Sequence, residues 1–185
     1  SLSSTASHAT GCKVSHRIVD IAMTCPIKSC SVIELGKLKI KSIMEGWLNH
    51  LESCANGIEF KGTIVIARKS KDDFEEALRW NPISSKDAKI IREQLHSLVS
   101  QGLNQCWPVP PESGWALAKA QKDNPEKANK IFERTWNGEF KLKGESQHAD
   151  MQLCFGKNCK ASVFLKNNDF HTALSLLYNP IIMNL

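Results

Sequence analysis

The sequence predicts an α+β fold in which helices pack on short, mostly antiparallel strands. Two long segments carry apolar residues every three or four positions, which is the periodicity of one face of a helix. Shorter segments, some of them rich in β-branched residues, have the composition of strands. The two kinds of segment come in runs rather than as a repeated strand–helix–strand series, which favours α+β over a parallel α/β sheet.

The elements of the N-terminal half follow a polar leader. The segment VSHRIVDIAM is short and mixed, fits either a strand or a helical turn, and ends at Pro26. Apolar residues spaced from Lys37 to Cys54 predict an amphipathic helix that stops at Gly57. IEFKGTIVIA predicts one bent strand or a hairpin, and KDDFEEALRW predicts a short helix with Asp72 as its cap.

A second helix follows a break at Pro82. Ser84 and Asp87 predict a capping box at its start, and Gly102 ends it. The proline-rich segment CWPVPPESGW is the main internal boundary. We therefore expect a flexible leader at 1–12, an N-terminal α+β region at 13–106, a connector at 107–113 and a C-terminal α+β region at 114–185.

The C-terminal half mixes both kinds of element. GWALAKAQKD and NPEKANKIFERTW predict two helices, the second with Pro125 in its first turn. EFKLKG, ADMQLCF and ASVFLK predict short strands because their apolar residues partly alternate. DFHTALSLLY predicts a closing helix capped by Asp169.

Composition indicates a protein of a reducing compartment. No run approaches the roughly 18 apolar residues that cross a bilayer, and the leader lacks the apolar core of a secretory signal. The cysteine count is odd, which would leave one thiol unpaired in an oxidising compartment. The seven are Cys12, Cys25, Cys30, Cys54, Cys106, Cys154 and Cys159. We expect a cytoplasmic location or, by analogy with injected effectors, the cytosol of a host cell.

The charge balance argues against nucleic acid as a partner. The chain has 24 basic and 19 acidic residues, a net charge of +5. Basic residues are interspersed with acidic ones, and the richest run, GKLKIKS, alternates lysine with apolar residues. A clustered basic stripe with interleaved aromatic residues is missing, so we expect no nucleic-acid partner.

Metal and cofactor sites are not expected either. Cys25 with Cys30 and Cys154 with Cys159 form two C-x4-C pairs, whose four thiolates have the composition of a tetrahedral zinc site. The pairs lie more than a hundred residues apart in the sequence, and Cys154 sits in an apolar pattern typical of a buried strand. The sequence also lacks phosphate-cradling and helical zinc-protease motifs.

One alternative is a papain-like cysteine hydrolase. Cys12 follows a glycine and precedes a possible helix, whose N-terminus would lower the pKa of a thiol. His148 would serve as the base, and Asp169 or Asn168 would orient it. Each of these residues also has an ordinary structural explanation as a leader, loop or capping residue.

A second interpretation comes from TCPIKSC, KDDFEEALR and NPISSKDAKIIREQL in that order. The series resembles the U-box, a zinc-free relative of the RING domain, and the U-box-like domains of bacterial NleG-type effectors. The resemblance covers residues 20–101 and implies that Ile27, Pro82 and Ile83 dock a ubiquitin-conjugating enzyme. Two departures are an additional helix over Lys37 to Cys54 and the missing arginine in the second loop.

The sequence therefore favours an intracellular protein-recognition domain. Its most specific interpretation is a U-box-like E3 ubiquitin ligase or effector. The resemblance implies transferase activity, whereas the residues alone leave open whether the chain is an enzyme. The alternatives are the hydrolase of Cys12, His148 and Asp169 and a non-catalytic interaction module. The expected partners are a ubiquitin-conjugating enzyme and a substrate protein; the oligomeric state stays open.

Overall fold

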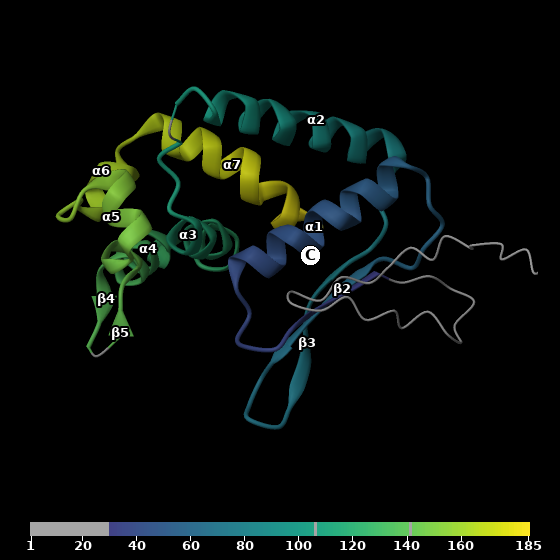
Figure 1. Ribbon diagram of the computed structural model, residues 1–185, viewed down its shortest axis with the longest axis horizontal. Helices are drawn as coiled ribbons and strands as arrows, with labels where there is room; N and C mark the ends of the chain where they lie inside the picture. Colours follow the sequence, from purple (N-terminus) through teal and green to yellow (C-terminus); the bar gives the residue numbers. More distant parts are fainter. Residues whose placement is uncertain (1–29, 106, 141) are drawn as a thin grey trace, which may run out of the picture. The chain divides into compact units, whose positions relative to one another are not determined.

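The computed structural model describes residues 30–105, 107–140 and 142–185. The chain divides into two compact units, the first ending at Ala88 and the second beginning at Lys89. Helices and short strands occur in both units (Figure 1), so the predicted α+β class is confirmed. The segment VSHRIVDIAM and Pro26 lie outside the described residues. The predicted domain boundaries at 12/13, 106/107 and 113/114 stay predictions.

The first unit is a three-stranded sheet with one helix packed on it. Its elements are β1 (Cys30–Glu34), α1 (Ile40–Ala55), β2 (Thr63–Arg68) and β3 (Phe74–Trp80). The strand order is β1-β2-β3, with β1 parallel and β3 antiparallel to β2. A Cβ atom at Gly46 would lie 3.2 Å from side-chain atoms of both Val65 and Trp80. Helix α1 thus approaches the sheet closely, and it buries Trp47 completely against it.

The amphipathic helix predicted over Lys37 to Cys54 is confirmed as α1, whereas the helix predicted over KDDFEEALRW is wrong. That segment forms β3, because its backbone pairs with β2 from Arg68↔Phe74 to Thr63↔Trp80. Leu78 and Trp80, two residues apart, are both buried, as the period of a strand requires. Tertiary pairing has overridden the local helix signal of Asp72.

Helix α2 (Ser85–Gly102) confirms the second predicted helix and its end. The predicted capping box is present: the Asp87 amide donates to Ser84 Oγ at 3.0 Å, and that hydroxyl donates to the Asp87 carboxylate at 2.6 Å. Ser85 Oγ donates to the Ala55 carbonyl at 2.9 Å, which fixes the start of α2 at the end of α1.

The second unit is mainly helical. After the end of α2 it contains α3 (Pro111–Asp123), η1 (Pro125–Lys127), α4 (Ala128–Asn137), β4 (Gly138–Glu139), β5 (Leu142–Lys143), η2 (Glu145–Gln147), α5 (Ala149–Phe155), α6 (Ala161–Leu165) and α7 (Asn168–Met183). Its core is aromatic: the Phe164 ring centroid lies 4.8 Å from that of Trp136 and 5.9 Å from those of Phe132 and Phe170. Edge-to-face and tilted ring pairs of this kind favour a single arrangement of α4, α6 and α7.

The two helices predicted before β4 are confirmed as α3 and as η1 with α4. The strands predicted over ADMQLCF and ASVFLK are wrong, because these segments form α5 and α6. Short apolar runs do not distinguish a strand from a helix; here packing of Phe155 and Phe164 on Trp136 decides. The cap of α7 is Asn167 rather than Asp169, since its Oδ1 accepts from the Asp169 and Phe170 amides.

Candidate nucleic-acid interface

The most strongly basic turn of the first unit lies at the carboxyl ends of β1 and β2. These two strands are parallel, so their carboxyl ends meet at the same edge of the sheet. The Arg68 amide donates to the Gly36 carbonyl at 2.9 Å, which joins the end of β2 to the turn after β1. The edge therefore brings together residues that lie more than thirty positions apart in the sequence.

Four exposed basic side chains project from this edge: Lys37, Lys39, Lys41 and Arg68. We call them the basic end. The residues between the lysines, Leu38 and Ile40, are half-buried and buried, so the alternation of the sequence turns the lysines outward. Among the described residues no carboxylate pairs with these three lysines. The guanidinium of Arg68 lies 5.6 Å from the centroid of the Phe74 ring, a cation–π contact.

The lysines of the basic end lie at the N-terminus of helix α1, where positive charge destabilises the helix. Lys39 is the N-cap of α1, and its first turn has no acidic residue. The N-terminus of a helix carries partial positive charge, so lysines there are unfavourable for the helix but add to its attraction for anions. This arrangement favours a phosphate ligand.

A buried carboxylate fixes the turn that carries the lysines. Glu34, at the end of β1, is only 8% exposed. Its Oε1 accepts from the Gly36 amide at 3.2 Å, and its Oε2 accepts from the Ser42 hydroxyl. These two hydrogen bonds join the turn to the sheet on one side and to α1 on the other. The lysines therefore project from an ordered backbone, which lowers the entropy cost of binding.

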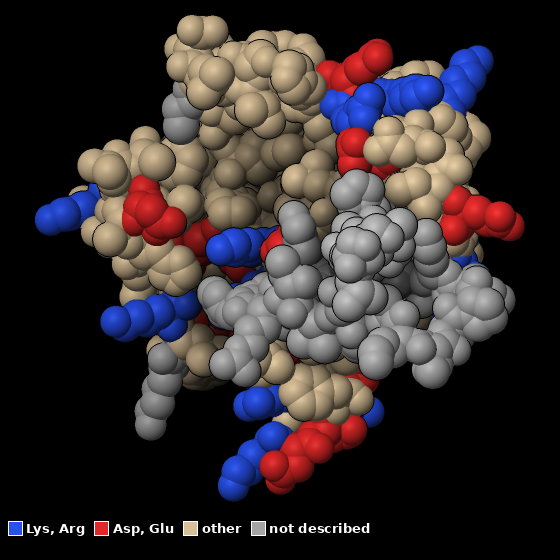
Figure 2. All heavy atoms as spheres, turned by 45° about the vertical axis from the view of Figure 1, so that its right-hand side comes forward, with Lys and Arg blue, Asp and Glu red and all other residues tan. Residues whose placement is uncertain are grey.

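Acidic residues of the first unit gather around the β2–β3 turn, which follows Arg68 at the same end of the sheet as the basic end. Asp72, Asp73, Glu75 and Glu76 are all exposed there. Lys69 and Glu75 form an ion pair at 3.4 Å across this turn. Figure 2 shows both signs of charge at the lower end of the molecule, where the β2–β3 turn lies. Both signs of charge therefore occur at this end of the sheet, with the three lysines on the β1–α1 connection and its helix start and the carboxylates around the β2–β3 turn.

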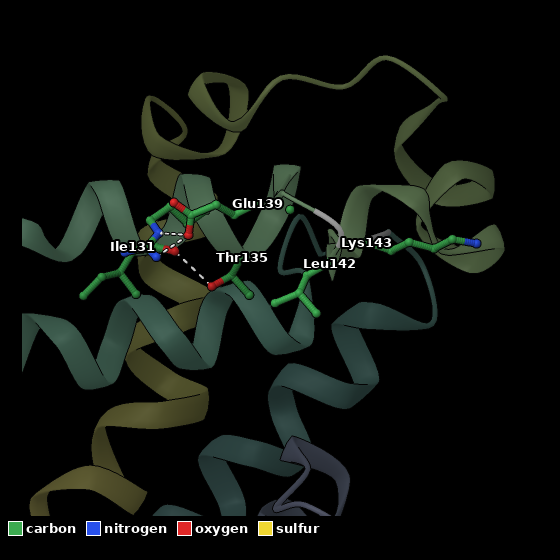
Figure 3. A pocket seen from close by; sticks show the side chains of 7 residues that line it. Ile131, Thr135, Glu139, Leu142 and Lys143 are labelled. Carbon is green, nitrogen blue, oxygen red and sulfur yellow. Dashed lines mark hydrogen bonds and ion pairs between the residues drawn. The ribbon is translucent and has the colours of Figure 1, made fainter.

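The second unit has a hollow between α4 and the β4–β5 hairpin (Figure 3). Its volume is about 340 Å³. It is lined by Ile131, Arg134, Thr135, Gly138, Glu139, Leu142 and Lys143. The Arg134 guanidinium is paired with the Glu139 carboxylate, with Nε 2.7 Å from Oε2. The Thr135 hydroxyl donates to the Ile131 carbonyl at 2.9 Å. Apart from Lys143, the polar side chains that line this hollow thus already bind groups within it.

His50, in the first unit, belongs to the core rather than to a binding site. The His50 ring is fully buried and stacks on Trp47 at 5.3 Å between centroids. Its Nδ1 lies 3.1 Å from Thr63 Oγ1 and its Nε2 lies 3.6 Å from Cys54 Sγ. Burial lowers the pKa of His50 to about 4, against a smaller opposing effect of the Asn81 backbone, and burial also raises the pKa of the Cys54 thiol. The ring is therefore neutral near pH 7 and sealed from ligands.

Only some of the residues expected for ligase or hydrolase chemistry lie in the described part of the chain. Ile27 and Cys12 lie outside it, whereas Pro82 is exposed and Ile83 half-buried between β3 and α2. His148 is exposed just before α5, and Asp169 is exposed in the first turn of α7. The arrangements of Ile27 with Pro82 and of Cys12 with His148 stay predictions. The basic end, by contrast, includes the lysines of the run GKLKIKS, whose alternation in the sequence predicts no nucleic-acid partner.

The cysteine pattern gives no further site in the described part of the chain. There, no group of three or more His, Cys, Asp or Glu residues is placed to hold a metal ion. Cys154 was expected to be buried in a strand, but it is exposed on α5, and Cys159 is half-buried. Cys12 and Cys25 lie outside the described residues. No helix of the described residues has both the length and the apolar character that a membrane crossing needs.

Comparison with known proteins overturns the expected function. Residues 7–122 match the model of the RecC C-terminal domain, whereas no curated protein matches the chain. The U-box resemblance is therefore wrong, and within KDDFEEALR the residues from Phe74 onward form strand β3 instead of the helix that the resemblance requires. The hydrolase, ubiquitin-ligase, effector and transferase assignments are contradicted by the same match, and nothing supports delivery into a host cell.

The expected partners are contradicted as well. RecC-type domains belong to the DNA-binding RecBCD complex, which conflicts with the exclusion of nucleic acid and with a ubiquitin-conjugating enzyme as partner. An interspersed charge pattern does not exclude a basic surface, because here the lysines are exposed while the apolar residues between them turn inward. The match spans well over half of the chain and the whole of the first unit's described part. The chain belongs to the RecC C-terminal domain family.

Proposed function

We propose that this protein acts in DNA repair and recombination and that its basic end binds the phosphate backbone of DNA. RecC is a subunit of the RecBCD helicase/nuclease, and RecC-type domains belong to a DNA-binding complex. The part of the chain that matches this family contains the basic end in full. Family membership thus indicates that the ligand is DNA, and the positions of the basic residues indicate which surface binds it.

The observation that carries the proposal is the arrangement of Lys37, Lys39 and Lys41. All three are exposed, lack carboxylate partners among the described residues and project from a turn held by Glu34. Duplex DNA carries one negative charge per roughly 1.7 Å of its axis, so adjacent lysines contact neighbouring phosphates. Contacts of this kind position a protein on DNA without reading its sequence.

The DNA interaction is tested with the full chain and a short fluorescein-labelled duplex. Fluorescence anisotropy is measured at several salt concentrations. The variant Lys37→Ala/Lys39→Ala/Lys41→Ala should bind more weakly than the wild type. The slope of log K against log salt should become shallower by up to about 2.7, which is roughly 0.9 for each phosphate that the variant no longer neutralises.

A matched control removes the same charge elsewhere. Lys61, Lys86 and Lys89 are also exposed. Lys61 precedes β2 and Lys86 follows β3, so these two lie at the end of the sheet opposite the basic end. Their triple alanine variant should keep most of the affinity and slope. An equal decrease of affinity in the two triple variants, or no binding by the wild type, would refute the proposal.

A further inference from the structure

The β4–β5 hairpin exposes an aromatic side chain that the basic end does not explain. Phe140, directly after β4, is 100% exposed, and Leu142 on β5 is 77% exposed. The backbone of Phe140 has φ = 54°, in the left-handed region that non-glycine residues rarely adopt. An aromatic ring in full contact with water, on a backbone of higher energy, is typical of a residue retained for a contact.

The base of the hairpin is closely joined to helix α4. A Cβ atom at Gly144 would lie 2.2 Å from the carbonyl carbon of Asn137, and one at Gly138 would lie 2.4 Å from the Leu142 oxygen. Only glycine fits at both positions. Helix α4 in turn is anchored by Trp136, which is 1% exposed in the aromatic core. Phe140 is therefore presented next to a fixed base, so binding orders little additional chain.

The charge around Phe140 favours an anionic ligand. Lys143 is exposed on β5, three positions after Phe140 in the sequence. Figure 3 shows the Lys143 side chain extending away from Glu139 and Thr135. Glu139, the carboxylate of the hairpin segment 138–143, is already paired with Arg134. Positive charge thus remains beside the exposed ring, whereas an apolar protein partner would require a broader apolar patch.

We propose that Phe140 stacks on a base of single-stranded nucleic acid while Lys143 contacts an adjacent phosphate. Proteins that bind single strands without sequence preference combine aromatic platforms with positive charge in this way, since every base has a π-face. The hairpin lies outside the residues that match the RecC C-terminal domain and in the second unit. This contact is therefore separate from the basic end and binds a different form of nucleic acid.

The test uses the full chain and a labelled oligothymidylate of about 12 nucleotides, within the site size of single-strand binding modules. Phe140→Ala should weaken binding by about tenfold, within the roughly 5- to 150-fold range of aromatic stacking. Phe140→Trp should retain the affinity, whereas Phe140→Leu should weaken binding as alanine does, because leucine keeps apolar surface but has no π-face. Lys143→Ala should weaken binding and make its salt dependence shallower.

Leu153→Ala is the matched control, because Leu153 is 87% exposed in the same unit. It should bind the oligothymidylate like the wild type, and circular dichroism should show that every variant is folded. Phe140→Ala should leave duplex affinity unchanged, which separates this contact from the basic end. The proposal is overturned if the wild type does not bind, if Phe140→Ala binds equally well, or if that variant changes only self-association in sedimentation.

Discussion

Replacing the buried imidazole of His50 by a side chain that does not titrate should make the first unit resistant to mild acid. The ring is packed between Trp47 and Trp80 and contacts Thr63 and Cys54, and none of these neighbours is a carboxylate. A proton on this ring would place a charge in the core, which burial strongly disfavours. The folded unit therefore keeps His50 neutral down to about pH 4, whereas the unfolded chain protonates it below its ordinary pKa of 6.5.

The loss of stability in acid can be calculated from the change in the pKa of His50 on folding. The pKa of His50 falls from 6.5 to about 4 on folding. Between these two values the unfolded chain binds more protons, so the contribution to stability is complete above pH 6.5 and is lost as pH falls towards 4. The linkage relation gives a decrease of about 2 kcal/mol at pH 5 and about 3 kcal/mol at pH 4.

Urea unfolding of the wild type and of His50→Gln, followed by tryptophan fluorescence from pH 7 to pH 4, measures this difference. His50→Gln is expected to be less stable at pH 7, because glutamine cannot stack on Trp47 as the imidazole does. Its stability should nevertheless fall less with acid, by about 2 kcal/mol at pH 5 relative to the wild type. Parallel curves for wild type and His50→Gln would refute the reasoning.

Two further predictions concern the second unit. The buried Glu145 carboxylate accepts from the Glu112 and Ser113 amides at 2.9 and 2.7 Å and so caps α3. Glu145→Ala should therefore lower the free energy of unfolding by about 2–3 kcal/mol in urea titrations, and an unchanged midpoint would refute the cap. Gly144→Ala should cost more than about 2 kcal/mol because its Cβ would overlap the α4 backbone. Gly156→Ala, strained but with open space around it, should cost only about 1 kcal/mol; equal melting temperatures would contradict this.

The long helices were predictable because the spacing of their apolar residues in the sequence shows which face of each helix is buried. Helices α1 and α2 each bury one stripe over four or more turns, and the Ser84 capping box marked the start of the second. Strand β3 was not predictable, since Asp72 imitates a helix cap and only the pairing with β2 decides the state of the segment. Helices α5 and α6 are shorter than two turns, too short for periodicity to distinguish them from strands.

The candidate site was predictable only in part, for a related reason. The lysines of GKLKIKS are close together in the sequence, but nothing local indicates that Leu38 and Ile40 turn inward and leave the charges on one side. Arg68 joins them solely through the parallel pairing of β1 with β2, and Glu34 fixes the turn through two tertiary hydrogen bonds. Contacts between distant segments therefore convert an interspersed charge pattern into a local surface.

Net charge is a weak guide to this surface. Residues 30–88 hold nine Lys or Arg and nine Asp or Glu, so the described part of the first unit has no net charge. If affinity for DNA followed net charge alone, removal of Lys61, Lys86 and Lys89 would weaken binding as much as removal of the three lysines of the basic end. Local field strength predicts the opposite, because charges further apart than a Debye length of about 10 Å are screened at ordinary salt. Comparing the two triple variants thus shows whether affinity for DNA depends on where the charges lie or only on the net charge.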